Sequence, residues 1–244
     1  MIQSRTVAYR GRDVDYRGEL FLGAGTGKRP GVVVFPEAFG LNDHARSRAR
    51  RLAERGYAAL AADLHGDGQV FDDMERLRPR MEALFGDRAA WRAMARAAWE
   101  ALLAQPEVDG ERTAAIGFCF GGATCLELAR SGAPLKAIAT FHAGLLPELP
   151  EDAGRIRCSV LICHGDEDPL VSRDVIDAVM GEWRRDRVDW EFIHFGGAAH
   201  SFTNPDAASR GMPGLAYHPK ADARSWAAMC RLFDEVFGEE EGGR

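Results

Sequence analysis

Short apolar runs alternate with amphipathic stretches along most of the chain. The runs are rich in β-branched residues, which is typical of strands buried on both faces of a parallel sheet. In the stretches between them, apolar residues recur every three to four positions, the period of an amphipathic helix. The pattern predicts strands over residues 14–22, 31–38, 57–63, 113–118, 135–142, 158–165 and 189–195. It predicts helices over residues 44–56, 72–84, 88–103, 120–130 and 173–185, and a last one with Trp226, Met229, Phe233 and Val236 on one face.

Strands that alternate with helices in this way indicate an α/β fold, with a mostly parallel central sheet and helices on both faces. No internal repeat or linker-like composition interrupts the alternation, so we expect a single domain over residues 1–244. The segment 23–31, "GAGTGKRPG", departs from a phosphate-binding loop because Lys28 is followed by Arg29 and a strand comes next. We expect this segment to be a hairpin connection between the two strands that flank it.

Composition narrows the classes of partner. The formal net charge is −6, which gives no electrostatic reason to expect nucleic acid or anionic lipid. No run approaches the roughly 20 apolar residues of a membrane span. The first residues lack an apolar signal core, so we expect a cytoplasmic protein without a membrane partner.

Five cysteines are scattered along the chain without CxxC spacing, which argues against a disulfide framework or a zinc site. No spacing of histidines or carboxylates resembles a metal site either, so we expect neither a metal nor another cofactor. Four of the cysteines have apolar neighbours and are expected to be buried: Cys125, Cys158, Cys163 and Cys230.

Residues capable of acid–base or nucleophilic chemistry follow four of the predicted strands. They are Glu37, Cys119, Asp168 and His200, and functional sites of open α/β sheets gather at the carboxyl ends of the strands. Cys119 is the centre of residues 117–121, "GFCFG", a sharp strand-to-helix turn like the G-x-S-x-G elbow with Cys in place of Ser. The start of the following helix favours the reactive thiolate.

The order nucleophile, acid, histidine along the chain is that of the α/β-hydrolases. His200 would act as the base, and an acid of "HGDEDPLV" would orient it. We prefer Asp168 for this role, because Asp166 can equally cap the turn. An alternative of another class is a thiol redox sensor or noncatalytic binding module, with Cys125 as the nearest resolving cysteine. A sensor needs neither Asp168 nor Glu37, and Cys125, six residues along a helix, should face away.

Taken together, these motifs resemble the dienelactone hydrolase family, cysteine members of the α/β-hydrolase fold. The resemblance covers nearly the whole chain. It rests on four segments in the same order: "PEAFGLN" (36–42), "GFCFGG" (117–122), "HGDEDPLV" (164–171) and "AHSFTNP" (199–205).

The resemblance implies a Cys119–His200–Asp168 triad, with Glu37 contacting the thiol in the resting state. A carboxylate close to sulfur disfavours a second negative charge and so keeps the thiol neutral. The resemblance also implies an oxyanion hole made by the backbone N–H groups at two positions, each donor contributing roughly 3 kcal/mol to the transition state. These positions are Ala38 and Phe120.

At one position the chain departs from the family members that cleave dienelactone. Those members carry an arginine four residues after the catalytic histidine, and here that position is Asn204. An amide cannot replace a guanidinium that grips a carboxylate with two hydrogen bonds. We expect Asn204 in the substrate pocket together with the aromatic residues Phe39, Phe71, Trp91 and Phe202. Such a lining favours neutral aromatic or apolar esters over a small dianion.

The sequence therefore predicts a cofactor-free hydrolase of activated esters or lactones that works through a covalent thioester. Its partner would be a small-molecule substrate, and the protein would be a monomer or a homodimer. A close alternative keeps the same triad and attacks an activated phosphotriester, since a neutral, aromatic-lined pocket would accept such molecules.

Overall fold

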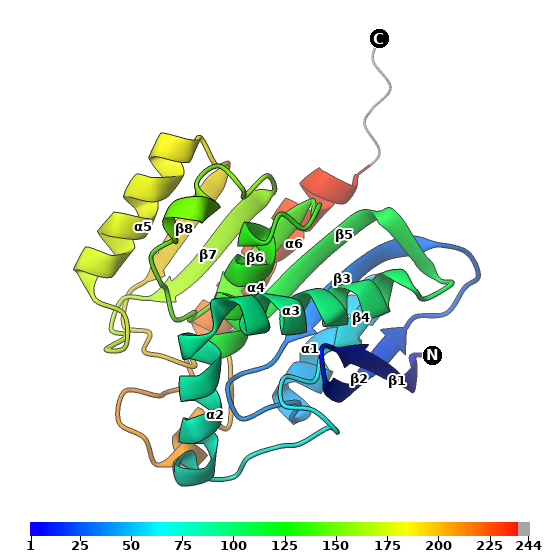
Figure 1. Cartoon of the computed structure of the whole chain (residues 1–244), viewed down its shortest axis with the longest axis horizontal. Coiled ribbons are helices and arrows are strands. Elements are labelled where there is room, and N and C mark those ends of the chain that lie inside the picture. Colours follow the sequence, from blue (N-terminus) through cyan, green and yellow to red (C-terminus); the bar gives the residue numbers. More distant parts are fainter. Residues whose placement is uncertain (239–244) are drawn as a thin grey trace.

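The apolar runs become the strands of one sheet with eight members, ordered β1-β2-β4-β3-β5-β6-β7-β8 in the computed structural model, which describes residues 1–238 (Figure 1). From β4 to β8 neighbouring strands run parallel, whereas β2 is antiparallel to both β1 and β4. The strands are β1 (Gln3–Gly11), β2 (Val14–Leu22), β3 (Arg29–Phe35), β4 (Ala58–Ala61), β5 (Val108–Phe118), β6 (Ala137–Phe141), β7 (Ser159–Gly165) and β8 (Trp190–Phe195).

Two features at the start of the chain differ from the sequence prediction. Strand β1 was not expected, because it lies at the sheet edge and only Val7 of its nine residues is buried. The predicted hairpin over residues 23–31 is wrong, since β4 lies between β2 and β3. The actual hairpin joins β1 to β2, where Gly11 is paired with Val14.

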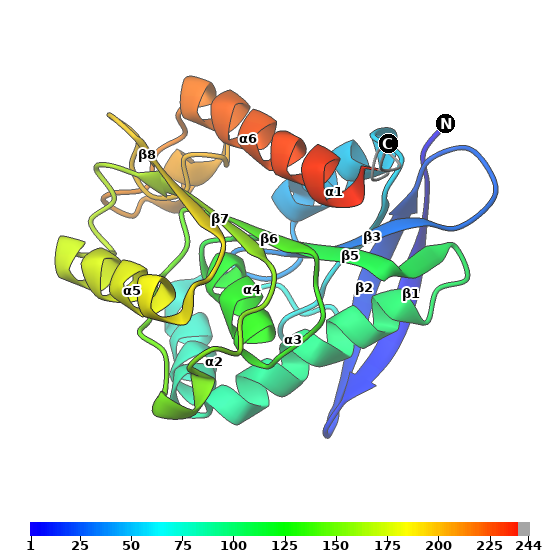
Figure 2. The same ribbon diagram turned by 90° about the horizontal axis from the view of Figure 1, so that it is seen from above.

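Helices cover both faces of the sheet (Figure 2). Helices α1 and α6 pack on one face, and α3, α4 and α5 pack on the other. The helices are α1 (Asp43–Glu54), α2 (Met74–Gly86), α3 (Arg88–Leu103), α4 (Phe120–Arg130), α5 (Arg173–Asp186) and α6 (Pro219–Phe237), with 3₁₀ turns η1 (Pro150–Asp152) and η2 (Ala207–Arg210). None of the helices in residues 1–238 has the length and apolar character needed to cross a bilayer.

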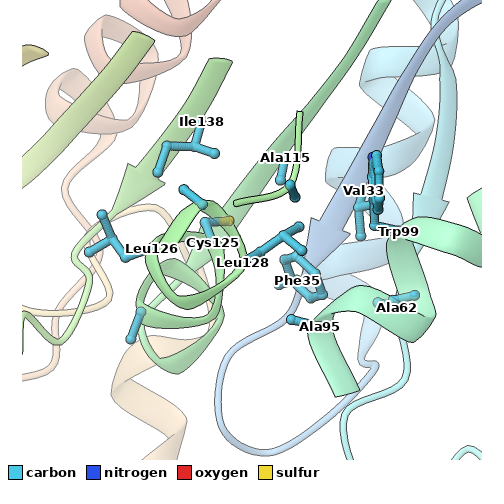
Figure 3. Packing of buried hydrophobic residues seen from close by; sticks show 14 of the residues in the cluster. Val33, Phe35, Ala62, Ala95, Trp99, Ala115, Cys125, Leu126, Leu128 and Ile138 are labelled. Atoms are coloured by element: carbon cyan, nitrogen blue, oxygen red, sulfur yellow. The ribbon is translucent and has the colours of Figure 1, made fainter. Parts of the chain in front are cut away.

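Two apolar cores, one on each face, fix the position of the central strands. In the larger core, strand side chains such as Val33 and Ile138 pack against Trp99 of α3 and Leu126 of α4 (Figure 3). Full burial of a large apolar side chain stabilises the fold by about 1.5–3 kcal/mol. The carboxyl ends of β3, β5, β7 and β8 are therefore held on a rigid platform, and the functional side chains are carried by the loops that follow.

Candidate active site

Cys119 lies at the apex of the turn between β5 and α4 with φ = 54° and ψ = −118°, a strained backbone conformation for a residue with a Cβ. The flanking glycines allow the close packing that this turn requires. A Cβ at Gly117 would lie 2.0 Å from the Gly121 carbonyl oxygen, and one at Gly121 would lie 2.2 Å from the Phe35 carbonyl oxygen. Substitution at either glycine would push β3, β5 and α4 apart.

Cys119 is also the one cysteine that is not fully buried; the four others are buried, as predicted. Burial raises the pKa of the Cys125 thiol well above its ordinary value and that of Cys158 to about 12. Cys125 points into the core between α4 and the sheet (Figure 3). It is therefore not positioned to resolve an oxidised Cys119, as the redox-sensor alternative would require.

His200 is oriented by Asp168. Its Nδ1 lies 2.7 Å from Oδ2 of Asp168, and both side chains are buried. The other ring nitrogen, Nε2, has no nitrogen or oxygen partner among residues 1–238. Burial by itself lowers the pKa of His200, but the adjacent Cys119 sulfur and the Asp168 carboxylate outweigh it and raise the pKa to about 10. Asp166 instead pairs with Arg173 at the surface.

The buried Glu37 carboxylate accepts one hydrogen bond on each oxygen. Ser201 Oγ donates to Oε1 at 2.8 Å, and Asn204 Nδ2 donates to Oε2 at 2.6 Å. Glu37 makes no hydrogen bond to Cys119 among the described residues, so the resting contact that the resemblance implied is not formed in this structure. Sequence reasoning missed Ser201, although it directly follows His200 in the chain. In the structure Ser201 has φ = 56°.

The backbone N–H groups of Ala38 and Phe120 donate to no protein acceptor in the described part of the chain. Phe120 is the first residue of α4, where helix N–H groups lack an intrahelical acceptor. Ala38 is held in place by His65, whose Nε2 lies 2.7 Å from the Ala38 carbonyl oxygen. His65 was not singled out from the sequence, although it follows the carboxyl end of β4.

Cys119 and His200 lie between two adjoining lobes of one cavity, and both lobes are also lined by Ala38, Met81, Phe85 and Leu170. The first lobe has a volume of about 240 Å³ and the second about 270 Å³. The further lining of the first lobe is Glu37, Phe39, Met74, Leu77, Ser201, Asn204, Ala207, Arg210, Met212 and Leu215. The further lining of the second is Phe120, Ala123, Gly144, Leu145 and Leu146.

Three aromatic residues expected in the pocket do not line it. Trp91 is buried, donates from its indole nitrogen to Thr124 Oγ1 at 2.9 Å and stacks beneath Phe120. Phe202 is fully buried in the core that α1 and α6 cover, and Phe71 packs behind Phe39.

One face of α2 lines the cavity instead. Its lining side chains recur at helical spacing: Met74, Leu77, Met81 and Phe85. This apolar face is visible in the sequence, but a face that lines a cavity has the same pattern as one that packs on a core.

A buried polar network supports the loop that carries His200. Thr203 Oγ1 lies 2.8 Å from His142 Nε2 and 3.2 Å from His44 Nε2, and Arg48 is paired with Asp222 at 2.9 Å. Burial lowers the pKa of His44 to about 3 and that of His142 well below its ordinary value. These histidines are neutral near pH 7 and act as fixed hydrogen-bonding groups.

No group of three or more His, Cys, Asp or Glu side chains in residues 1–238 is arranged to hold a metal ion. The cavity offers a thiol, an oriented imidazole and two N–H donors without a protein acceptor in the described residues, within a mostly apolar lining. This set of groups is suited to acyl transfer.

Comparison with known proteins agrees with this geometry. The model of the dienelactone hydrolase family matches residues 17–237. The solved structure of m3DLH is 71% identical in sequence and superposes with a TM-score of 0.94, covering 96% of this chain and 98% of that one. P91, a dienelactone hydrolase-like promiscuous phosphotriesterase from metagenomic libraries, is 61% identical, with a TM-score of 0.95 and the same coverage.

A Yersinia pestis protein assigned by its name as a carboxymethylenebutenolidase is 28% identical over 221 residues, which is 86% of this chain and 79% of that protein. The family match begins within β2 and runs to the end of α6, and it includes every candidate site residue. The chain belongs to the dienelactone hydrolase family and is a hydrolase with the α/β-hydrolase fold.

Proposed function

We propose that the protein hydrolyses activated esters or lactones through a covalent thioester on Cys119. The observation that carries this proposal is the placement of Cys119 at a positive-φ apex beside a His200 that is hydrogen-bonded to Asp168. The raised pKa of His200 favours the imidazolium, so Nε2 is suited to take the proton of the thiol as the sulfur attacks.

In the first half-reaction the Cys119 sulfur attacks the ester carbonyl carbon, and the carbonyl oxygen becomes an oxyanion. The N–H groups of Ala38 and Phe120 would stabilise that oxyanion, each by about 3 kcal/mol. The C–O bond then breaks, and His200 gives its proton to the departing oxygen. Asp168 keeps the ring in the orientation that presents Nε2 to this oxygen.

In the second half-reaction water replaces the leaving group. His200, now neutral, takes a proton from the water, and the resulting hydroxide attacks the thioester carbonyl carbon. The C–S bond breaks, the carboxylic acid is released, and the sulfur again pairs with the protonated His200. Atoms and charge balance over the two steps without a redox partner.

The leaving group decides which substrates react. A thiolate is itself a good leaving group, so the tetrahedral intermediate returns to substrate unless the departing oxygen leaves at least as easily. Enol lactones and aryl esters meet this condition, and amides do not. Asn204 donates its amide to Glu37 and is not free to grip a substrate carboxylate, so we expect uncharged substrates.

A second candidate is the hydrolysis of activated phosphotriesters, and it is favoured by the 61% identity to P91. Here the sulfur would attack phosphorus, an S–P bond would form and an aryloxide would leave with the His200 proton. Water would then cleave the S–P bond. The variant His200→Ala should accumulate the phosphorylated enzyme, which intact-mass measurement detects as an adduct on Cys119; absence of an adduct after exposure to an aryl phosphotriester contradicts this route.

The test of the main proposal is the early time course of p-nitrophenol release from p-nitrophenyl acetate. The wild-type protein should show a rapid phase whose amplitude equals the enzyme concentration, and Cys119→Ala should lose it. Cys125→Ala is the matched control, because that cysteine is buried in the core, and it should retain the rapid phase. Release that is unchanged in Cys119→Ala would refute the thioester mechanism.

A further inference from the structure

The second lobe of the cavity differs in chemistry from the first. Beyond the residues that it shares with the first lobe, its walls are Phe120 and Ala123 of α4 and residues 144–146 after β6. Apart from Cys119 and His200, which both lobes share, every side chain in this lining is apolar. The first lobe adds Glu37, Ser201, Asn204 and Arg210, and so presents both signs of charge.

Two arginines hold the wall of the second lobe, and one of them is buried. Arg130 is 1% exposed, pairs with Glu127 at 3.0 Å and donates to the Leu146 carbonyl oxygen at 2.8 Å. Arg88 donates to the Pro147 carbonyl oxygen at 2.9 Å. Charge-assisted hydrogen bonds of this kind fix the segment after β6, so the second lobe is a preformed site.

The two lobes border different parts of the reacting groups. The first lobe is lined by the segment that follows His200, the group that protonates the departing oxygen under the proposed mechanism. The second lobe is lined by the first turn of α4, which begins directly after Cys119. Under the proposed mechanism the acyl group stays bonded to the Cys119 sulfur. An apolar lining also offers nothing to stabilise the negative charge that develops on a leaving oxygen.

We propose that the second lobe binds the acyl group and the first lobe binds the leaving group, so that the substrates are esters of uncharged apolar acids larger than acetic acid. This assignment rests on the proposed function and names the substrate class of that same site. A volume of about 270 Å³ is on the order of nine water volumes, enough for an acyl group such as hexanoyl or benzoyl.

Gly144 provides the test. It lines the second lobe, a Cβ built on it has no heavy atom within 4 Å, and its φ lies outside the left-handed region. Gly144→Leu therefore adds four carbon atoms at the wall of the lobe without straining the backbone. The matched control is Met74→Trp, which adds bulk at the exposed rim of the first lobe.

The measurement is kcat/KM for three substrates: p-nitrophenyl acetate, p-nitrophenyl hexanoate and 4-methylumbelliferyl acetate. Gly144→Leu should lower the value for the hexanoate at least about tenfold and change the two acetates by less than about twofold, because loss of room for a few methylenes costs that much in an apolar pocket. Met74→Trp should lower the value for 4-methylumbelliferyl acetate and leave the ratio of hexanoate to acetate at its wild-type level.

Two outcomes overturn the assignment: an equal loss on all three substrates by a Gly144→Leu protein of wild-type Tm, or a loss confined to 4-methylumbelliferyl acetate. Ala123→Val, from the wall that α4 forms, is the second variant, and it must reproduce the selectivity against hexanoate if Gly144→Leu does not fold. Failure of the proposed function has a separate signature, which is the absence of an acyl adduct on Cys119 in the wild-type protein; that result overturns both.

Discussion

Ser201→Ala probes how the Glu37 carboxylate is kept away from the nucleophile. Ser201 Oγ is the donor to one carboxylate oxygen, Asn204 is the donor to the other, and Glu37 is only 5% exposed. Both carboxylate oxygens are thus occupied on the side of the loop after His200. Loss of the serine hydroxyl leaves one buried carboxylate oxygen without its donor, while the Asn204 contact is retained.

The expected magnitude follows from that one hydrogen bond. A hydrogen bond to a charged group contributes about 1.5–3 kcal/mol. The Cys119 thiol lines the same cavity as Glu37, and we expect its S–H to become the donor to the freed oxygen. A carboxylate bonded to S–H favours the neutral thiol over the thiolate. At 1.4 kcal/mol for each factor of ten, the fraction of thiolate near pH 7 should fall by roughly 10- to 100-fold.

The assay is the rate of alkylation by iodoacetamide, which reacts with thiolates. The four other cysteines are buried, so a single adduct in the intact mass reports on Cys119. Ser201→Ala should be alkylated roughly 10- to 100-fold more slowly than the wild-type protein at pH 7, and kcat/KM for p-nitrophenyl acetate should fall in parallel. Ser209→Ala is the matched control, because Ser209 lies in the same loop but is exposed and donates only to the Asp206 carbonyl oxygen.

The double variant Glu37→Gln/Ser201→Ala separates charge from disturbance of the loop. Without a carboxylate at position 37, alkylation of Cys119 should return to within about threefold of the wild-type rate, since additivity fails where two residues interact directly. Two results would refute the reasoning: alkylation of Ser201→Ala at the wild-type rate, or a double variant that stays as slow as the single one. Either would mean that the Glu37 carboxylate does not suppress the reactivity of Cys119.

Three further results are expected. Asp168→Asn should lower kcat/KM for p-nitrophenyl acetate by about 10³- to 10⁴-fold, because the amide no longer orients the imidazolium; a loss of less than tenfold would show that His200 does not depend on this contact. The pKa of His200 is raised from 6.5 to about 10. The difference in unfolding free energy between the wild-type protein and His200→Asn should therefore be complete below pH 6.5 and be lost as the pH rises toward 10. A difference measured by urea unfolding that does not change with pH contradicts this. Arg130→Met removes a cation that is 1% exposed and pairs with Glu127, but Glu127 keeps its pair with Arg92 at 2.7 Å. Urea unfolding should therefore show a loss of about 1–3 kcal/mol, typical of a buried group that loses one hydrogen-bonding partner, and no measurable loss would mean that the pair is dispensable.

The central strands of the fold were predictable because they are buried on both faces. β3, for example, is apolar at nearly every position, which a two-sided core requires. β1 was not predictable, since at the sheet edge most of its side chains face water and only Val7 is buried. The insertion of β4 between β2 and β3 also escaped the sequence, because which strands pair is decided by the packing of distant segments and not by the loop between two runs.

The chemistry of the site was more predictable than its lining. Cys119 directly follows β5 and His200 lies in the loop after β8, and a parallel sheet brings all carboxyl ends to one edge. Lining residues have no such marker. Trp91 is aromatic and close to the nucleophile, yet its indole finds Thr124 and it belongs to the core. Cytoplasmic residence and a monomeric or homodimeric state stay predictions.

The segment 200–204 shows why substitutions near this site should not act independently. Its five consecutive side chains bind four different groups: the base contacts Asp168, two side chains hold the Glu37 carboxylate, one aromatic ring enters the core under α6, and Thr203 joins the buried histidine network. One short loop therefore sets the position of the base, the position of the nearby carboxylate and the packing behind both. A change in any one of these contacts shifts the backbone that the others share, so the effects of paired substitutions in this segment should depart from additivity by 0.5–3 kcal/mol, as is typical of residues in one network.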